Sequence, residues 1–394
     1  MNQPLEGIRI IDLTTFLSGP FCTMLLGDMG AEVIKIEEPQ AGDPNRNSGP
    51  FIGGEGAYFL YTNRNKKSMT LNLQTLAGHD ILLKLVKNAD VFVENFRPQV
   101  KKRLKIDYST LNKINPRLIY CSISGFGQTG PWADRPGFDQ IAQGMSGLMS
   151  VTGFQETGPT RVGVAIGDSV CGILAAYGIL VALIERNKSG MGQFIETSLL
   201  EGLISILGFQ AAKFFATGEI PLPQGNDHAT YAPYGTYKTK DGYINIATAT
   251  QKMWEILCQI LEIEELKKDS RFLNNDDRVR NKKQLKEIIE SKLVQKKSAE
   301  WVEIMNERGV PCGIINTIDQ VFKDPQVLHQ KMLLEADHPK AGRIKMIGFP
   351  VKFDRTPGII SMPPPLLGQH TKEILKELNY SEEEIENLKK SGII

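Results

Sequence analysis

The sequence lacks the short signatures of several common enzyme and binding-protein classes. It contains no GxxxxGK[ST] phosphate loop, no HExxH zinc motif and no GxSxG nucleophile motif. Its five cysteines are scattered and never form a CxxC pair. This spacing argues against a zinc site or a disulfide framework and predicts reduced thiols in a cytoplasmic protein. Internal repeats and low-complexity segments are also absent from the sequence.

The sequence has no excess of charge of either sign. A total of 46 Lys and Arg against 45 Asp and Glu gives a formal net charge of +1. No global field therefore favours nucleic acid or a membrane surface, and phosphate-bearing ligands would need local groups of basic residues. We expect no signal peptide, because no basic segment followed by an apolar one opens the chain. The longest uncharged stretch is interrupted by Asp168, and its helical part is expected to be shorter than the roughly 20 residues of a membrane span.

The first half of the chain alternates between strand and helix patterns, which predicts an α/β fold. Its 394 residues also favour two domains. Apolar runs predict strands over 8–13, 31–36, 68–73, 89–94 and 118–124. Helical spacing predicts helices over 21–29, 75–86, 100–104 and 108–114. Such alternation is typical of a Rossmann-like, doubly wound parallel sheet.

The pattern changes after about residue 216, where a Pro-, Gly- and Asn-rich segment predicts a linker. A hairpin with a turn at Asp241-Gly242 and three helices, over 252–261, 282–293 and 298–308, are expected to follow. We therefore expect a large Rossmann-like domain formed by 1–216 and 326–394. A smaller α+β domain with linkers would comprise 217–325.

The stretch 162–185 places a lone carboxylate in an apolar context. A short apolar run ends at Gly167, Asp168 follows, and no further charge occurs before Glu185. This pattern predicts a strand, a turn and a helix, with Asp168 at the helix N-terminus, where open sheets bind ligands. Backbone N–H groups would keep the acid ionised there. Asp168 is then either a nucleophile or, with Ser169, a helix cap, and the local pattern alone slightly favours the cap.

Basic residues gather in three places just beyond predicted strands. They are Arg64, Lys66 and Lys67; Arg97, Lys101, Lys102 and Arg103; and Arg135. Such groups suit several phosphates on a neutral protein, although solvated surface charge is the simpler interpretation of any single lysine. The GxGxxG match at 125–130 predicts a glycine-lined turn and not a dinucleotide site, because prolines interrupt the helix that should follow. The five histidines lie apart in the sequence, which favours a nucleophilic carboxylate over paired proton transfer.

Several strings, in order along the chain, resemble the family III CoA-transferases, a group that also contains the 2-methylacyl-CoA racemases. They include GAEVIKIEEP, NRNKKSMTLNL, VENFRP, SGFGQTGP, RPGFDQIAQGMSGLM, VGVAIGDSVCGI and PYGTYKTKDGYINIA. The resemblance implies an interlocked homodimer of ring-like subunits with a CoA-binding Rossmann-like domain. Coenzyme A and acyl-CoA would be substrates, with no tightly bound cofactor, no metal, and no nucleic-acid or membrane partner.

The resemblance also assigns roles to individual residues. It makes Asp168 the nucleophile that forms an acyl-aspartyl anhydride and then an aspartyl-CoA thioester. Residues expected to contact CoA are Arg64, Lys67, Asn95, Phe96, Arg97, Arg103 and Arg135. Residues expected to line the substrate pocket are Phe16, Leu17, Gly19, Phe138 and Asp139.

Two alternatives to a transferase follow from the same resemblance. The racemase branch is expected to carry a histidine where this chain has Phe138, and phenylalanine cannot exchange a proton, so transfer is favoured over racemisation. A CoA-binding protein without turnover is the other alternative. Formyl-CoA transferases are expected to differ at Leu17, at Glu38 and at 247–251, which argues against a formate- or oxalate-specific enzyme.

Overall fold

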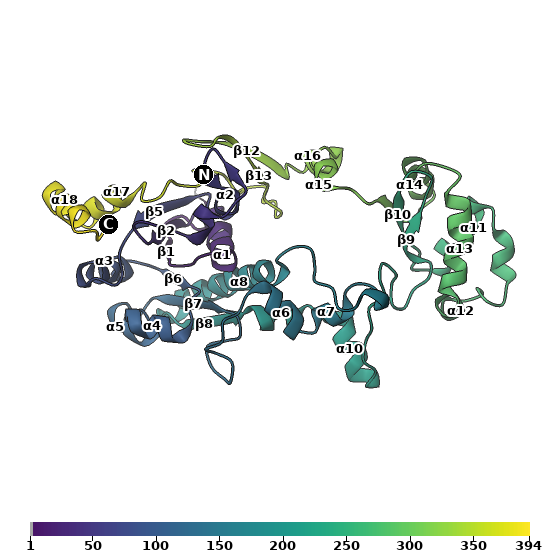
Figure 1. Ribbon diagram of the computed structural model, residues 1–394, viewed down its shortest axis with the longest axis horizontal. Helices are drawn as coiled ribbons and strands as arrows, with labels where there is room; N and C mark the ends of the chain where they lie inside the picture. The colour runs from purple at the N-terminus through teal and green to yellow at the C-terminus, as the bar shows by residue number, and fades with distance from the viewer. Residues whose placement is uncertain (1–2) are drawn as a thin grey trace. The chain divides into compact units, whose positions relative to one another are not determined.

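The computed structural model describes residues 3–394, which divide into two compact units. The larger unit comprises 1–149, 161–217 and 328–394, and the smaller comprises 150–160 and 218–327. The sequence placed the boundaries at 216/217 and 325/326, and the segment 150–160 is an addition to the smaller unit. Figure 1 colours the chain by residue number, so that the purple helices and strands belong to the larger unit and the green ones to the smaller.

A six-stranded parallel sheet forms the centre of the larger unit. Its strands are β1 (Arg9–Asp12), β2 (Glu32–Glu37), β5 (Lys66–Thr70), β6 (Val91–Glu94), β7 (Ile119–Ser124) and β8 (Phe194–Ser198). They pair in the order β5-β2-β1-β6-β7-β8, with every neighbouring pair parallel. The order reverses between β1 and β6, as in a doubly wound Rossmann-like sheet. The predicted fold class is therefore confirmed at the level of an α/β fold with a large parallel sheet.

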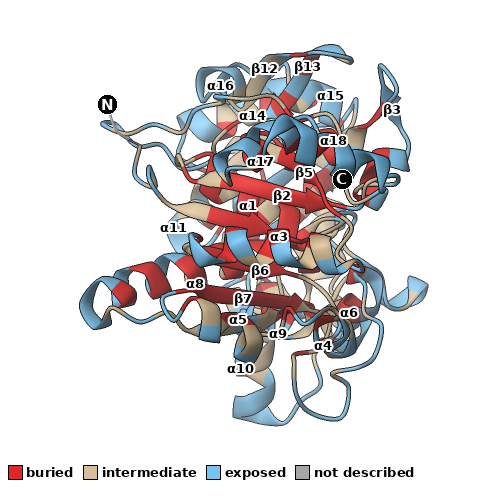
Figure 2. Cartoon of the chain, turned by 90° about the vertical axis from the view of Figure 1, so that its left-hand side faces the viewer, coloured by how far each residue is buried: buried red, intermediate tan, exposed pale blue. Residues whose placement is uncertain are grey.

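Helices cover both faces of this sheet, because successive strand residues point to opposite sides. One face packs with α1 (Ser18–Gly27), α6 (Asp139–Met145), α8 (Ile166–Ser189) and α9 (Leu199–Ser205). The other packs with α3 (Leu76–Lys87), α5 (Tyr108–Ile114), α17 (Thr371–Glu377) and α18 (Glu382–Lys390). Adjacent residues of β1 show the alternation, since Ile10 belongs to the first core and Ile11 to the second. Figure 2 shows the strands between the helices in the red of buried residues.

The remaining elements of the larger unit lie at its periphery. The helices are α2 (Ala57–Thr62), α4 (Pro98–Leu104) and α10 (Gly208–Thr217), with α7 (Leu148–Val151) at the boundary between the units and α16 (Pro325–His329) at the other boundary. Two short antiparallel pairs join β3 (Phe51–Ile52) with β4 (Glu55–Gly56), and β12 (Leu333–His338) with β13 (Gly342–Ile347).

The smaller unit has its own core. The antiparallel strands β9 (Tyr234–Lys238), β10 (Tyr243–Ala247) and β11 (Cys312–Ile314) form its sheet. Its helices are α11 (Gln251–Leu261), α12 (Asn275–Arg280), α13 (Lys282–Leu293), α14 (Ser298–Glu307) and α15 (Ile318–Val321). Buried Trp254 and Phe272 lie in a core that all three strands and three of these helices enclose. The predicted hairpin and its three helices are all present.

The prediction of a strand at 162–166 is wrong. These residues form an irregular segment, and α8 begins at Ile166 and runs for 24 residues. The sheet position that a strand here would occupy belongs to β8, which pairs with β7 after the long helix. The expectation that this helix is shorter than the roughly 20 residues of a membrane span is also wrong. By length and composition α8 qualifies as a candidate membrane span, and 44% of its most apolar window is buried within the fold. Asp168 thus lies inside the first turn of a helix and not in a strand–helix turn.

Gly172 allows α1 and α8 to cross at close range. A Cβ on this glycine would lie 2.7 Å from the backbone oxygen of Ser18, the first residue of α1. Since a backbone oxygen cannot move aside cheaply, the contact requires glycine. Gly172 is one helical turn after Asp168, so the close approach brings the N-terminus of α1 beside the acid.

We predict that Gly172→Ala destabilises the protein by about 1–3 kcal/mol, because the added methyl group overpacks the contact between α1 and α8. Gly178→Ala in the same helix is the matched control, since its Cβ would meet only a side-chain atom at 3.4 Å. This control should be stabilised by about 0.5–1 kcal/mol through the helix propensity of alanine. Urea unfolding of both variants measures the difference. Equal effects of the two substitutions would contradict this account of the crossing.

Candidate active site

The two loops that leave β1 and β6 diverge at the point where the strand order reverses. Parallel sheets open a ligand crevice at such a point, beyond the carboxyl ends of the strands. Here a pair of hydrogen bonds joins the loops. Thr15 N–H donates to Asn95 Oδ1 at 3.0 Å, and Asn95 Nδ2 donates to Thr15 O at 2.7 Å. The Asn95 amide therefore fixes the floor of the crevice.

A cavity of about 390 Å³, which we call the Asp168 pocket, lies on one side of this floor. Asp168, Ser18 and Leu199 come from three helices. The other lining residues come from the end of β7, from α4 and from the loops after β1, β6 and β7, and they are Thr15, Phe16, Asn95, Phe96, Arg97, Val100, Ile123, Ser124, Gly125, Pro136, Gly137 and Phe138. Among these described lining residues, Arg97 is the only ionised side chain apart from Asp168.

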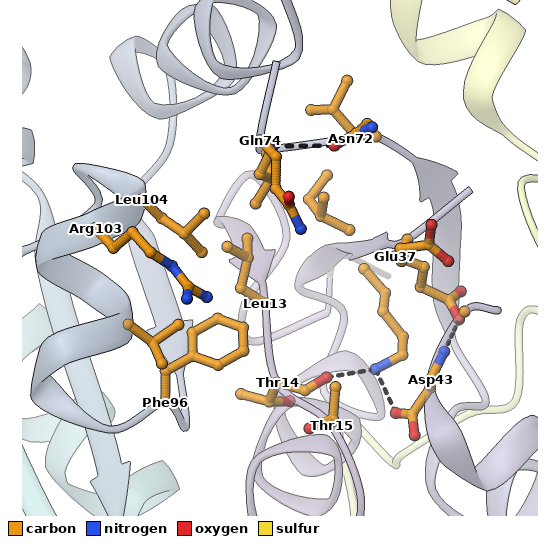
Figure 3. A pocket seen from close by; sticks show the side chains of 17 residues that line it. Leu13, Thr14, Thr15, Glu37, Asp43, Asn72, Gln74, Phe96, Arg103 and Leu104 are labelled. Carbon is orange, nitrogen blue, oxygen red and sulfur yellow. Dashed lines mark hydrogen bonds and ion pairs between the residues drawn. The ribbon is translucent and has the colours of Figure 1, made fainter. Parts of the chain in front are cut away.

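A second cavity of about 270 Å³, the Arg103 pocket, adjoins the first and is drawn in Figure 3. Thr15, Phe96 and Val100 line both cavities, and we call the two adjacent cavities together the groove. Figure 3 shows the guanidinium of Arg103 beside the ring of Phe96, with Glu37 and Asp43 on the opposite side of the pocket. The groove thus has Asp168 and Arg97 in one pocket. In the other, Arg103 and Lys35 lie with the acids Glu37, Glu38 and Asp43.

Burial and a neighbouring acid raise the pKa of Asp168 to about 6. Burial is the larger cause, and repulsion from Asp139 adds to it. Hydrogen bonds from the hydroxyl and the backbone N–H of Ser18 act in the opposite direction and favour the carboxylate. At neutral pH the group is mainly ionised, yet its carboxylate is less stable than that of an ordinary aspartate.

Asp139 fixes the start of the helix that carries Asp168. Its Oδ1 accepts the backbone N–H of Gly167 at 2.8 Å, which satisfies one of the free donors at the N-terminus of α8. Its Oδ2 accepts Gln143 Nε2 at 2.7 Å. The orientation of Gln143 is itself set by Val162, whose N–H donates to Gln143 Oε1 at 2.8 Å. Asp139 is buried and supports the site without lining either pocket.

A buried ion pair holds the loop after β1 from below. Lys35 Nζ lies 2.9 Å from Asp43 Oδ2, and neither side chain is exposed. The same ammonium donates to Thr14 O at 2.7 Å, and Figure 3 marks both interactions by dashed lines that end at Thr14 and Asp43. Asp43 Oδ1 accepts the N–H of Phe16 at 3.3 Å. Lys35 and Asp43 thus fix the backbone of residues 14–16 at two points.

The structure brings six of the predicted site residues to the Asp168 pocket. They are Phe16, Asn95, Phe96, Arg97, Phe138 and Asp168. Arg103 lines the adjoining pocket. Arg135 is exposed beside Pro136 and stacks on Trp132 at 5.1 Å. Leu17 and Gly19 lie on either side of Ser18 but line neither pocket.

Arg64 and Lys67 line neither pocket of the groove, and their contact with CoA stays a prediction. Arg64 Nε and Nη2 donate to the two carboxylate oxygens of Asp28 at 2.9 and 2.7 Å, and the side chain is buried. Lys67 pairs with Glu32 and Glu373 at 3.0 and 2.7 Å. Both residues lie at the amino end of β5, opposite the crevice, and their charges serve ion pairs within the fold.

Lys101 is unavailable to a ligand, although the sequence grouped it with Arg97 and Arg103. Its ammonium is buried between Glu94 Oε1 at 3.0 Å and Ser122 Oγ at 2.9 Å. Glu94 also accepts the N–H of Phe96 at 2.8 Å, so this pair shapes the turn that carries Arg97. Helical spacing explains the difference, since Lys101 and Arg103 point to different sides of α4.

Sequence reasoning missed Ser18, Lys35 and Asp43. A signal for Ser18 was available, because a serine before Gly-Pro at a helix start is a common donor or acceptor at helix termini. Lys35 had a weaker signal as a lysine inside an apolar strand, where an unpaired charge would be costly. Nothing local marked Asp43, which lies in a loop rich in Gly, Pro and Asn.

The Asp168 pocket combines a carboxylate with apolar side chains and an arginine. No histidine is among the described residues that share the pocket with Asp168. Arg97 and Arg103 supply the positive charge that phosphates would need. Within residues 3–394, no group of three or more His, Cys, Asp or Glu side chains is placed to hold a metal ion.

Comparison with known proteins identifies relatives of the whole chain. The sequence profile described as "CoA-transferase family III" matches residues 5–371. Succinyl-CoA:glutarate CoA-transferase of Mus musculus is 42% identical over 394 residues, which cover 100% of this chain and 90% of that protein. Acetyl-CoA:oxalate CoA-transferase of Acetobacter aceti is 40% identical over 89% of each chain. A crystal structure of a CAIB/BAIF family protein from Brucella suis superposes with a TM-score of 0.87 at 37% identity, covering 96% of this chain and 100% of that one.

We predict that Asp139→Asn lowers the pKa of Asp168 from about 6 toward its ordinary value of about 3.8, because the repulsion from a neighbouring carboxylate is removed. A carbodiimide labels protonated carboxyl groups, so the pH midpoint of Asp168 labelling, followed by mass spectrometry, should move to lower pH. The substituted asparagine can still accept the N–H of Gly167, but its amide NH₂ would face Gln143 Nε2, so a modest loss of stability should accompany the shift. An unchanged or higher midpoint in a folded variant would exclude Asp139 as a cause.

Proposed function

We propose, since the chain belongs to CoA-transferase family III and is a CoA-transferase, that it moves CoA from an acyl-CoA donor to a free carboxylic acid through covalent intermediates on Asp168. The observation that carries this proposal is a half-buried carboxylate, with a raised pKa and no histidine partner in its pocket, at one end of a groove that carries two arginines.

The reaction begins when a carboxylate oxygen of Asp168 attacks the thioester carbonyl of the donor. The C–S bond breaks, CoA leaves as a thiolate, and a mixed anhydride forms. The thiolate then attacks the aspartyl carbonyl, which releases the donor acid and leaves an aspartyl-CoA thioester. The acceptor carboxylate attacks that thioester to give a second anhydride. Finally the thiolate attacks the acceptor's acyl carbon, so that the new acyl-CoA departs and Asp168 is regenerated as a carboxylate.

The environment of Asp168 favours the acylated states. Burial and the charge of Asp139 destabilise its carboxylate, and both effects disappear when acylation makes the group neutral. The N–H and hydroxyl of Ser18 hold the carboxylate in place. Once an anhydride or thioester is present, the same donors are placed to stabilise the oxyanion that forms at the aspartyl carbonyl.

The groove accommodates CoA with its thioester end at Asp168. Arg97 in the Asp168 pocket and Arg103 in the adjoining pocket would bind the phosphates. The pantetheine arm would pass Thr15, Phe96 and Val100, which the two cavities share. Asn95 contributes by joining the loops after β1 and β6 rather than by contacting CoA, because its amide oxygen and its amide nitrogen both bond the backbone of Thr15.

The relatives suggest which substrates to try first. Two similar proteins are named for glutarate or oxalate as the acid and for succinyl-CoA or acetyl-CoA as the donor. We propose a dicarboxylic acid as the acceptor here, with succinyl-CoA and glutarate as the first pair, on the strength of 42% identity over the full chain.

We predict that the protein converts succinyl-CoA and glutarate into glutaryl-CoA and that Asp168→Asn loses at least about a thousandfold in kcat/KM. Liquid chromatography with mass spectrometry detects the new thioester. Trapping with hydroxylamine should convert Asp168 of the native enzyme to a hydroxamate only when acyl-CoA is present.

The same variant separates a catalytic from a structural loss. Because the pKa of Asp168 is raised by folding, ionisation opposes folding above about pH 6 and has no effect below about pH 4. Asp168→Asn should therefore be at least as stable as the native protein at pH 7.5. Transferase activity retained by this folded variant would refute the mechanism, and exchange of an α-proton without an acceptor acid would indicate a racemase instead.

We further propose that the active form is a homodimer. The larger unit exposes apolar side chains along one side of α8, namely Ile173, Tyr177, Leu180, Val181 and Ile184. Beside them lies an apolar hollow of about 360 Å³ that includes Phe349 and Phe353. Exposed apolar surface of this extent is typical of a face that associates with another chain, and most soluble oligomers are symmetric dimers.

We expect light scattering after size-exclusion chromatography to give a mass near twice the 43.8 kDa of the chain. Tyr177→Glu, which places a charge at the centre of the apolar face, should reduce the dimer fraction. Lys389→Glu on exposed α18 is the control and should leave the mass unchanged. A monomeric native protein would contradict the proposal.

A further inference from the structure

Two phenylalanine rings are in contact at the Asp168 pocket. Phe16, in the loop after β1, and Phe138, just before α6, meet edge to face with ring centroids 5.8 Å apart and an interplanar angle of 89°. Both rings line the Asp168 pocket, and they are 42% and 62% exposed. Large exposed apolar rings gain little stability for the fold, so their position in the pocket calls for another explanation.

Each of these rings lies close in sequence to a residue that hydrogen-bonds Asp168 or the adjacent Gly167. Phe16 lies two residues before Ser18, whose N–H and hydroxyl bind the Asp168 carboxylate. Phe138 precedes Asp139, whose Oδ1 binds the N–H of Gly167 at 2.8 Å. The two segments therefore contact each other through the rings, and both also contact the start of α8 that carries Asp168.

The backbone of Phe16 adopts a left-handed conformation, which is unfavourable for a non-glycine residue. Its φ is +65°, in the left-handed region, which costs a non-glycine residue of order 1–3 kcal/mol. Asn45 Nδ2 donates to Phe16 O at 2.6 Å, and Asp43 Oδ1 accepts the Phe16 N–H at 3.3 Å. Asp43 is held in turn by Lys35 in a pair with no exposure to solvent. Asn45 and this ion pair thus impose the conformation that directs the Phe16 ring toward Phe138.

Water is the chief competitor in the chemistry proposed above. A water molecule that attacks an acyl-aspartyl anhydride gives a free acid and the Asp168 carboxylate, and the CoA thiolate takes a proton and leaves as free thiol. The net result is hydrolysis of the donor thioester in place of transfer. An apolar cover beside Asp168 reduces the access of water while leaving the polar groups that bind the carboxylate in place.

We propose that Phe16 and Phe138 form an aromatic cover that protects the acylated Asp168 from water, and that Asn45 is a positioning residue that holds Phe16 in this cover. The proposal rests on the transferase function, and it concerns how the enzyme divides its covalent intermediate between water and the acceptor acid. Its measure is the partition ratio, defined as free CoA formed by hydrolysis divided by acceptor thioester formed.

The test compares Phe16→Ala, Phe138→Ala and Asn45→Ala with the native enzyme, using succinyl-CoA and glutarate at equal concentrations. A thiol reagent measures free CoA, and chromatography measures glutaryl-CoA in the same samples. Each alanine variant should raise the partition ratio about tenfold, since a tenfold change corresponds to a difference of about 1.4 kcal/mol between the two barriers. Phe138→Leu keeps an apolar side chain and should raise the ratio less than Phe138→Ala.

Phe215→Ala on α10 is the matched control, because Phe215 is 81% exposed and lines neither pocket. Its partition ratio should equal that of the native enzyme. A loss of transfer without any gain of hydrolysis in the three alanine variants would overturn the aromatic cover and leave the transferase function intact. A native enzyme that forms no glutaryl-CoA or other acyl-CoA from any acid would instead overturn the proposed function, and the cover with it.

Discussion

The divergence of the loops after the neighbouring strands β1 and β6 is the constraint on which the site depends. A right-handed crossover takes the chain from β1 to β2 and β5 on one side, and later strands continue on the other side of β1. The loops after β1 and β6 consequently separate, and the two hydrogen bonds between Asn95 and Thr15 fix the distance between these loops where they leave the sheet. Both cavities of the groove open beside this pair, so the ligand site is a consequence of strand order.

Buried charges hold the same loops rigid. Asp12, the last residue of β1, lies 3.1 Å from Lys66, and both side chains are fully buried. Although burial acts to raise the pKa of Asp12, Lys66 and Lys35 bring it to about 2, whereas desolvation lowers the pKa of Lys66 to about 8. Replacing such a pair with apolar residues of similar size often leaves stability unchanged or increases it, so its presence under the crevice fits a role in fixing geometry.

Asp168 lies at a helix start but does not have the environment of a capping aspartate. A capping aspartate would be exposed and stabilised by the N–H groups of its own helix, but here Asp139 binds the N–H of Gly167. The Asp168 carboxylate instead accepts hydrogen bonds from Ser18 of a different helix, and burial together with Asp139 raises its pKa. The sequence placed the acid correctly at a helix start but favoured a cap, because the two helices that decide its environment are 150 residues apart along the chain.

The alternation of strands and helices and the hairpin at Asp241-Gly242 could be predicted from the sequence, since periodicity and turn chemistry are local. The candidates Asp168, Arg97 and Arg103 came from the charge pattern and the family resemblance. Which basic residues are paired with acids depends on the tertiary structure. Arg64, Lys67 and Lys101 resemble Arg103 in sequence, yet each is neutralised by an acid that folding brings to it: Asp28, Glu32 and Glu94. The start of α8 at Ile166 and the pairing of Phe16 with Phe138 likewise depended on distant partners. Charge pairing and ring contacts act through space, and sequence order does not record those distances.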